Sequence, residues 1–187
     1  MLNTFRRLLR RHRLLYAAWA FVLTWFGKIC LFWMKPLVTL DDIEDCRHLI
    51  HNGDIICTRS RRYPVCWTIP GKYKHTATYT GHGMIIHAVS PHVCEMTLRE
   101  FLAHYDGFIV LRPRPPFNWK AADRWAFINL KVDYDFAFSP NTEFNDPLYC
   151  HELGATYLEK GGVKIQQKGD CILAEDLMAV CDVVMEV

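Results

Sequence analysis

The hydrophobic and polar residues of this 187-residue chain change their pattern sharply near the N-terminus. Residues 5–13 contain five arginines, and residues 14–34 are apolar apart from one lysine. Beyond this segment, short apolar runs of strand length are separated by Gly and Pro, which is typical of a domain that mixes strands with helices. We therefore divide the chain into an N-terminal segment, 1–36, and one folded domain, 37–187.

The apolar segment is long enough to cross a membrane. Its 21 residues would rise about 30 Å as a helix, which matches the hydrocarbon core of a bilayer. Tyr16, Trp19 and Trp33 lie toward its ends, where aromatic rings favour the interface. We expect residues 14–34 to form a single membrane-anchor helix, with the arginine-rich N-terminus cytoplasmic and the domain on the opposite side. The alternatives are an in-plane helix on the membrane surface, and a segment that is buried in the domain or cleaved.

In the domain, apolar and β-branched residues alternate in four runs that predict strands: Gly53–Thr58, His75–Thr80, Met84–Val89 and Phe108–Arg112. Gly81 and Gly83 flank a tight turn between the second and third runs. Thr97 followed by Glu100 is a capping box that opens a short helix, and Trp119–Lys131 has apolar residues at helical spacing. The domain is therefore predicted to be α+β, with these four strands in one antiparallel sheet.

A further helix is predicted near residue 150. Asp146 is the expected N-cap, Pro147 suits the first helical position, and Gly161 lies where the helix should end. Cys150 would then lie in the first turn, where unpaired backbone N–H groups and the helix dipole lower the pKa of a thiol. This position suits a nucleophile, and the backbone N–H of Cys150 is the expected donor to an oxyanion.

Two histidines are candidates for a base and the group that orients it. His75 opens one predicted strand and His87 closes the next, twelve residues later. In a hairpin centred on residue 81 the two are directly opposed, and the strand period of two directs both side chains to the same face. A thiol nucleophile needs such a pair, because one imidazole takes its proton while the other group fixes the tautomer of that imidazole.

Composition excludes several other classes of protein. Hydrophobic residues make up 51% of the chain, so it is not a disordered protein, and a formal net charge of +2 gives no bulk attraction to nucleic acid. The eight cysteines form no C-x-x-C pair, which excludes a zinc ribbon and a thioredoxin-type motif. The arginines at positions 59, 61 and 62 are interpreted as a solvated loop rather than a phosphate or lipid-headgroup patch. We expect no metal and no organic cofactor.

The domain resembles the permuted papain-like hydrolases, and within them most closely the YiiX/YaeF-type branch of the NlpC/P60 superfamily. The resemblance covers about residues 50 to 160 and rests on six short motifs in a fixed order: G-D-I-I (53–56), K-H-T-A-T-Y-T-G-H-G-M-I-I-H-A-V (74–89), E-M-T-L-R-E-F-L (95–102), I-V-L-R-P (109–113), Y-D-F-A-F (134–138) and L-Y-C-H-E-L (148–153). It implies a circularly permuted papain-like fold, in which the histidine-bearing strands precede the cysteine-bearing helix.

The same resemblance implies roles for single residues. Cys150 matches the nucleophile of the family, His75 its base and His87 its third polar position. The YiiX-like pattern usually has Glu at this third position, whereas a His twelve residues after the first looks more like the lecithin:retinol acyltransferase branch. The motifs also suggest three supporting or substrate-binding positions, namely Glu152, Tyr149 and Asp54.

Together these observations predict a membrane-anchored cysteine hydrolase, a thiol peptidase or amidase. It would cleave an amide bond through a thioester intermediate, with the peptides of peptidoglycan as the favoured substrate. Its partners would be a peptide or an acyl amide or ester, and the lipid bilayer through residues 14–34, but no nucleic acid. The alternatives are a lipid or lipoprotein acyl hydrolase or acyltransferase, a catalytically silent membrane-tethered binding module, and a non-enzymatic membrane protein that acts through its arginine-rich helix.

Overall fold

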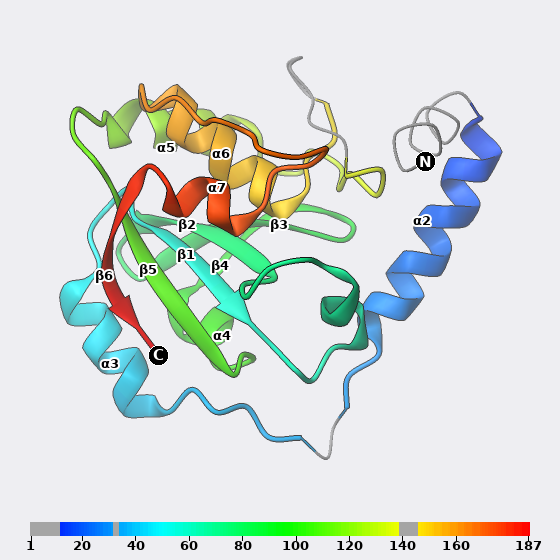
Figure 1. Cartoon of the computed structure of the whole chain (residues 1–187), viewed down its shortest axis with the longest axis horizontal. Coiled ribbons are helices and arrows are strands. Elements are labelled where there is room, and N and C mark those ends of the chain that lie inside the picture. The colour runs from blue at the N-terminus through cyan, green and yellow to red at the C-terminus, as the bar shows by residue number, and fades with distance from the viewer. Residues whose placement is uncertain (1–11, 32–33, 139–145) are drawn as a thin grey trace.

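Six antiparallel strands form the centre of the computed structural model, which describes residues 12–31, 34–138 and 146–187 (Figure 1). The strand order is β4-β3-β2-β1-β5-β6. Their bounds are β1 Ile55–Arg59, β2 His75–Gly81, β3 Met84–Val89, β4 His92–Thr97, β5 Gly107–Pro113 and β6 Cys181–Glu186. The predicted α+β class is confirmed, and the four predicted strands are β1, β2, β3 and β5.

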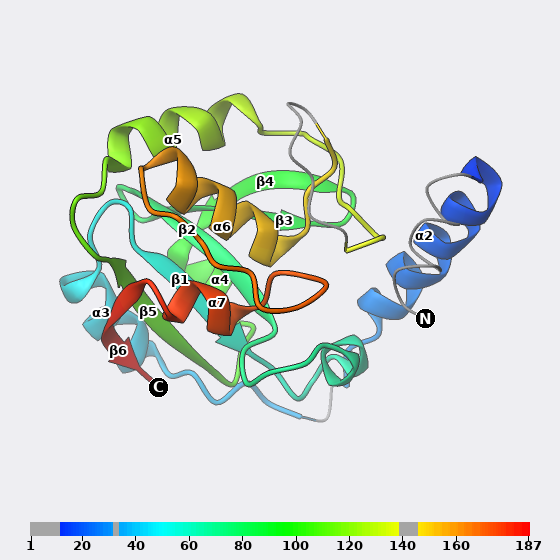
Figure 2. The ribbon, with the colours of Figure 1, turned by 45° about the horizontal axis from the view of Figure 1, so that its top comes forward.

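Helices cover both faces of the sheet (Figures 1 and 2). One face carries α5 (Trp119–Ile128), α6 (Cys150–Lys160) and α7 (Ala174–Met178), and the other carries α3 (Leu40–Leu49) and α4 (Leu98–Leu102). Alternate strand residues enter the two cores, so that Ile55 and Cys57 pack beneath α6 while Ile56 and Ala77 pack beneath α4. The first and second residues of β2, His75 and Thr76, consequently face opposite layers.

The predicted short helices have the expected starts. Thr97 and Glu100 form a reciprocal capping box at the start of α4, and Asn118 caps α5, which ends at Ile128 rather than at residue 131. The elements β4, β6, α3, α7 and the 3-10 helix η1 (Pro64–Thr68) were not predicted. The two strands were missed because each buries only one residue, Val93 in β4 and Cys181 in β6, so neither has an alternating apolar pattern.

The hairpin between β2 and β3 differs from the predicted register. His87 lies opposite Ala77 rather than opposite His75, because the turn is centred between Gly81 and Met84 and not on residue 81; the register also shifts between Tyr79 and Gly81. Positive φ angles at three successive residues allow this bulged turn: +95° at Gly81, +52° at His82 and +75° at Gly83. His75 and His87 are therefore diagonal neighbours, although the prediction that they share one face of the sheet is confirmed.

The helix α6 begins later than its sequence suggested. Tyr149 is the N-cap and Cys150 the first helical residue, so the expectation of Asp146 as N-cap and Pro147 as first residue is wrong. Leu148 is extended because it bridges a neighbouring segment, donating to Asp133 O at 3.0 Å and accepting from Asp135 N at 3.2 Å. The predicted end at Gly161 is confirmed.

The N-terminal helix α2 (Arg13–Lys28) is shorter than the predicted span over 14–34. It ends because the chain becomes extended at Ile29, and Leu31 N then donates to Arg62 O at 2.8 Å. The prediction of a continuous helix over 14–34 is thus wrong. Across the described ranges, no helix is both long enough and apolar enough to traverse a bilayer. The arginines before residue 12, and residues 32 and 33, lie outside the described residues.

Candidate functional site

The thiol of Cys150 lies against the main chain of β2. Its Sγ is 4.0 Å from the carbonyl oxygen of Lys74, and the backbone N–H groups of Thr76, of His151 and of Cys150 itself interact with the sulfur. Lys74 and Thr76 are the two neighbours of His75 in the chain. The sulfur is therefore held beside the main chain of His75, at the point where α6 begins.

The rings of His75 and His87 are hydrogen-bonded to each other. His75 Nε2 lies 2.9 Å from His87 Nδ1, and the two rings meet edge to face with centroids 5.2 Å apart. This bond occupies the nitrogen of His75 that is farther from the main chain. The other ring nitrogen of His75 is Nδ1, which lies on the main-chain side of the ring.

Two aromatic side chains hold the histidine pair from the α4 side of the sheet. Phe101 packs against both imidazoles, with ring centroids 5.8 Å from His75 and 5.4 Å from His87. Tyr105 stacks on His75 with an angle of 18° between the ring planes. Sequence analysis missed both aromatic residues: Phe101 lies in the helix that the Thr97 capping box opens, whereas Tyr105 lies beyond the end of that helix. They restrict the rotation of His75.

Burial determines the charge state of this cluster. Desolvation, and then the neighbouring His87 and His151, hold the pKa of His75 well below its ordinary value, and burial lowers the pKa of His87 to about 4. Burial also raises the pKa of the Cys150 thiol to about 12, because its cost outweighs the opposing backbone N–H groups. The predicted lowering of this pKa is therefore wrong. The candidate pair is a neutral thiol beside a neutral imidazole.

The structure places the three predicted supporting residues differently. Glu152 is buried one turn into α6, where Oε2 accepts from the backbone N–H of Tyr149 at 3.4 Å. The Tyr149 hydroxyl accepts from Ile172 N at 2.7 Å. Both residues thus fix the start of α6. Asp54 lies just before β1, at the opposite end of the strand from Thr58, which pairs with His75. Its carboxylate forms a bidentate ion pair with Arg112, at 3.0 and 2.7 Å. Asp54 is therefore not brought to Cys150.

Two further polar residues lie beside the candidate pair. Thr76 Oγ1 is 2.6 Å from His151 Nδ1, and the sulfur of Cys57 is 3.4 Å from the same hydroxyl. All three side chains are buried. Sequence analysis gave no role to this group, and the signal that could have found it is adjacency, since Thr76 follows His75 and His151 follows Cys150.

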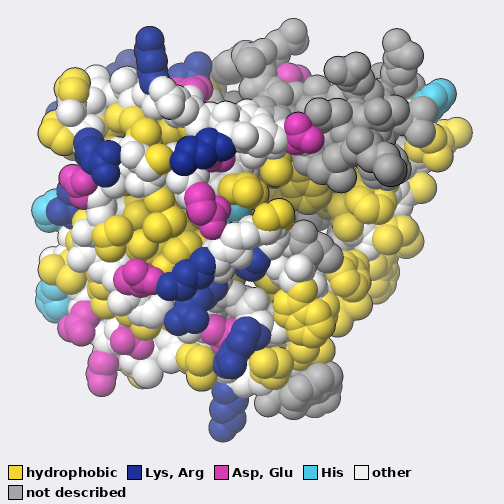
Figure 3. All heavy atoms as spheres, in the orientation of Figure 1, with side chains coloured by type: hydrophobic (Ala, Val, Ile, Leu, Met, Phe, Trp, Pro, Cys, Tyr) yellow, Lys and Arg dark blue, Asp and Glu magenta, His cyan; other side chains and the backbone are white. Residues whose placement is uncertain are grey.

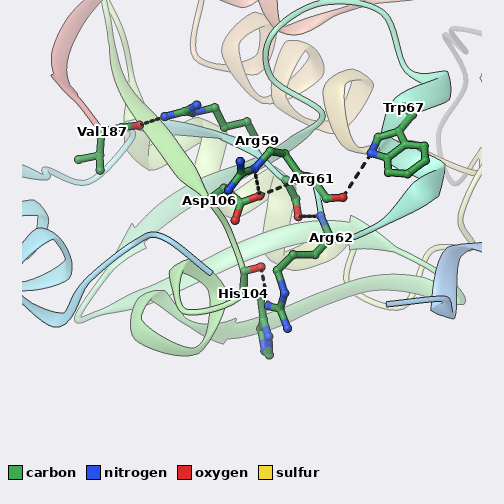
Figure 4. Close-up of polar contacts among 8 residues, drawn as sticks. Arg59, Arg61, Arg62, Trp67, His104, Asp106 and Val187 are labelled. Atoms are coloured by element: carbon green, nitrogen blue, oxygen red, sulfur yellow. Dashed lines mark hydrogen bonds and ion pairs between the residues drawn. The ribbon is translucent and has the colours of Figure 1, made fainter. Parts of the chain in front are cut away.

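The arginines at the end of β1 and in the loop after it do not form a common anion site (Figure 4). Arg59 donates to Val187 O at 3.3 Å and Arg62 to His104 O at 3.4 Å, while Arg61 is bound through its backbone N–H to Asp106 at 2.6 Å. Figure 4 shows the guanidinium groups of Arg59 and Arg62 pointing away from each other. These contacts organise the loop between β1 and η1.

Comparison with known proteins found similarity to one family model and to a solved structure. A family model described as permuted papain-like amidase enzyme, YaeF/YiiX, C92 family, matches residues 49–178. The crystal structure of the metalloprotein yiiX from Escherichia coli O157:H7 has a similar fold, with a TM-score of 0.54 and 22% sequence identity over 64% of this chain and 71% of that one. A search of curated protein sequences found no match. Among the side chains that the structure describes, no three His, Cys, Asp or Glu gather in a way that could hold a metal ion.

Proposed function

The chain belongs to the permuted papain-like amidases of the YaeF/YiiX type, and we propose that it hydrolyses amide bonds with Cys150 as nucleophile and His75 as base. One observation carries this assignment. The sulfur of Cys150 lies against the main chain on both sides of His75, whose far ring nitrogen is already bonded to His87. These contacts support a catalytic set of thiol, base and orienting group in the order that covalent catalysis requires.

The bond between the two histidines fixes the tautomer of the base. If Nδ1 of His75 is to accept the thiol proton, its Nε2 must carry hydrogen and donate to Nδ1 of His87. His87 then accepts without bringing a negative charge, unlike the carboxylate usual at this position. An imidazolium at His75 is consequently stabilised little at rest, in agreement with its lowered pKa. Proton transfer accompanies attack on the substrate, and no thiolate forms beforehand.

The proposed reaction balances in two steps. Sγ of Cys150 bonds to the amide carbonyl carbon while its proton passes to Nδ1 of His75. The C–N bond then breaks, the leaving nitrogen takes that proton, and the acyl group remains as a thioester on Cys150. Water, deprotonated by His75, attacks the thioester and releases the carboxylic acid and the free thiol.

The start of α6 provides donors for the oxyanion of both steps. The backbone N–H groups of Cys150 and His151 belong to the first turn of the helix, where no earlier helical carbonyl is available to them. Both interact with the sulfur at rest. When the carbonyl carbon bonds to that sulfur, its oxygen comes within the same reach, so these are the two donors that we assign to the oxyanion.

We also propose that the enzyme works on a membrane surface, with α2 lying in the plane of the interface. The helix is attached to the domain along one side: Trp19 Nε1 donates to Phe136 O at 3.0 Å, and Thr24 Oγ1 is 3.2 Å from Ser90 Oγ. Tyr16 adds a third contact, since its hydroxyl accepts from Phe136 N at 3.2 Å, and contacts spread from Tyr16 to Thr24 favour an in-plane orientation over a crossing one. The topology with a cytoplasmic N-terminus, which assumed a span, stays a prediction.

The opposite side of α2 is apolar and faces outward. Leu14 is 86% exposed, Phe21 65% and Trp25 61%, and no charged residue occurs between positions 14 and 27. Figure 3 shows hydrophobic side chains gathered along this edge of the molecule. An exposed apolar patch that includes tryptophan, next to an arginine-rich sequence, suits the interface of an anionic lipid membrane.

Two classes of substrate are compatible with this setting. Peptide amides, including those of peptidoglycan, agree with the amidase family. Acyl amides or esters of lipids and lipoproteins are favoured by the outward face of α2 and by the histidine at position 87. A panel that contains both classes tests the function, with acid quenching and peptide mass spectrometry to trap the acyl group. We expect an acyl adduct on Cys150 alone. Turnover that persists in Cys150→Ala would contradict the proposal.

Membrane attachment is tested by vesicle flotation of the full chain. We expect binding to vesicles that contain phosphatidylglycerol, and at least a tenfold weaker affinity for the double variant Phe21→Glu, Trp25→Glu, since burying each side chain stabilises by about 1.5–3 kcal/mol. Ile128→Glu, at an exposed apolar position on α5, is the matched control and should bind like the unchanged chain. Equal binding of the double variant and the control would disprove this role of α2.

A further inference from the structure

We infer that Thr76, His151 and Gly154 form a clamp that sets the position of Cys150 relative to His75. The inference rests on the proposed function and adds positioning residues to it. The clamp joins the residue after the base to the residue after the nucleophile, through the hydrogen bond between Thr76 Oγ1 and His151 Nδ1 at 2.6 Å.

Burial makes this hydrogen bond the main determinant of the His151 ring. The side chain of His151 is 2% exposed, and its other ring nitrogen, Nε2, has no hydrogen-bond partner among the described residues. The bond to Thr76 is thus the one polar contact of the ring that the described structure offers. A buried polar group with a single partner loses much of its stabilisation when that partner is removed.

Gly154 completes the clamp from the next turn of α6. A Cβ atom at this position would lie 2.8 Å from Cγ2 of Thr76, closer than real contacts allow, and 3.2 Å from Cδ1 of Leu177. Glycine therefore permits α6 to approach β2 at Thr76. The threonine is held by its hydroxyl at His151 and by its methyl group at Gly154, so both its rotation and the height of the helix above the strand are fixed.

This placement matters for the reacting groups. The backbone N–H of Thr76 interacts with Sγ of Cys150, and the same peptide chain carries the ring of His75 on the other face of β2. The His75 ring is held by His87 on β3 and, from the α4 side, by Phe101 and Tyr105. Besides the contact of Cys150 itself, the clamp links the α6 layer to this end of β2. Loss of the clamp would leave both groups intact but misaligned, and misplacement of about 1 Å can cost about a hundredfold in rate.

A double-mutant cycle measures this alignment without a known substrate. The rate of Cys150 alkylation by iodoacetamide at pH 7 is followed by peptide mass spectrometry, with and without His75→Gln. In the unchanged chain we expect His75→Gln to slow alkylation by about tenfold or more, because the base is lost. In the Thr76→Val background, which keeps the shape and removes the hydroxyl, His75→Gln should slow it less than about twofold.

Two matched variants complete the test. Thr78→Val removes a buried hydroxyl two residues along the same face of β2, and should keep the full effect of His75→Gln. Thr76→Ser keeps the hydroxyl and should restore the effect of His75→Gln on alkylation. Should Thr76→Val not fold, as judged by circular dichroism, His151→Gln breaks the same bond from the helix side and should abolish the effect equally.

The outcomes separate the two proposals. An undiminished effect of His75→Gln in folded Thr76→Val or His151→Gln would overturn the clamp and leave the catalytic assignment standing. No effect of His75→Gln in the unchanged chain would overturn the pairing of Cys150 with His75, and the clamp with it.

Discussion

Replacing Cys150 by serine is expected to reduce amide hydrolysis by at least about 10³-fold, with little effect on the fold. A hydroxyl is a much weaker nucleophile than a thiol, and its proton is harder to remove by an imidazole whose pKa is already lowered by burial. The serine is nearly isosteric with cysteine at this 4% exposed position. Hydrolysis of the preferred amide from the substrate panel, measured beside thermal unfolding, checks this result.

Cys171→Ser is the control for the cysteine variant. Cys171 is a free, partly buried cysteine that packs against the core beneath α6, so its replacement tests general sensitivity to loss of a thiol. We expect its activity to stay within about twofold of the unchanged chain, as is usual for substitutions away from the reacting groups. Retention of more than a tenth of the activity by Cys150→Ser would rule out a thiol nucleophile at this position.

His75→Gln is expected to reduce hydrolysis by about 10²- to 10⁴-fold, the range that a general base contributes. The pH profile of the unchanged enzyme gives a second readout. Because the pKa of His75 is lowered, the imidazole stays neutral as the pH falls through 6.5, and its function as a base is lost only when the pH reaches the lowered pKa. The value of kcat/KM should therefore remain constant from pH 8 to below 6.5 and decline in more acidic buffer.

His48→Gln provides the comparison for this variant. His48 is exposed on α3, far from the cysteine-bearing helix. Its replacement should leave both the rate and the pH profile unchanged. A profile that already declines with an apparent pKa near 6.5 would show that His75 is not buried in the working enzyme. Full activity of His75→Gln would show that another group takes the thiol proton.

Most of the sheet could be predicted because its central strands are buried and two of them are separated by a clear glycine turn. The runs around Ile55, Ala77, Ile86 and Val110 are apolar or β-branched, and Gly81 and Gly83 mark the turn between two of them. The edge strands were not predictable in this way, since an edge strand with one buried residue looks like a loop in the sequence. The register of the hairpin could not be predicted either, because a bulge at consecutive positive φ angles depends on the conformation of the whole turn.

The residues of the candidate site could be predicted from the sequence, but their charge states could not. Cys150, His75 and His87 could be selected by residue type, spacing and family resemblance, whereas the charge of each depends on burial by residues distant in sequence, such as Phe101 and Tyr105. The helix start shows the same limit. Asp146 and Pro147 are good local signals, but the bridge that Leu148 makes to a distant segment overrides them.

The histidine pair and the thiol are brought together over very different lengths of chain. The bond between His75 and His87 spans 12 residues and closes with one hairpin, whereas the contact of Cys150 with Lys74 spans 76. Long-range contacts cost more loop-closure entropy and form later in folding than local ones. We therefore expect the imidazoles to pair before the helix docks, and under the proposed function Cys150 acquires its base only when α6 docks. Under the proposed function, reactivity toward amides is then expected of the finished fold alone.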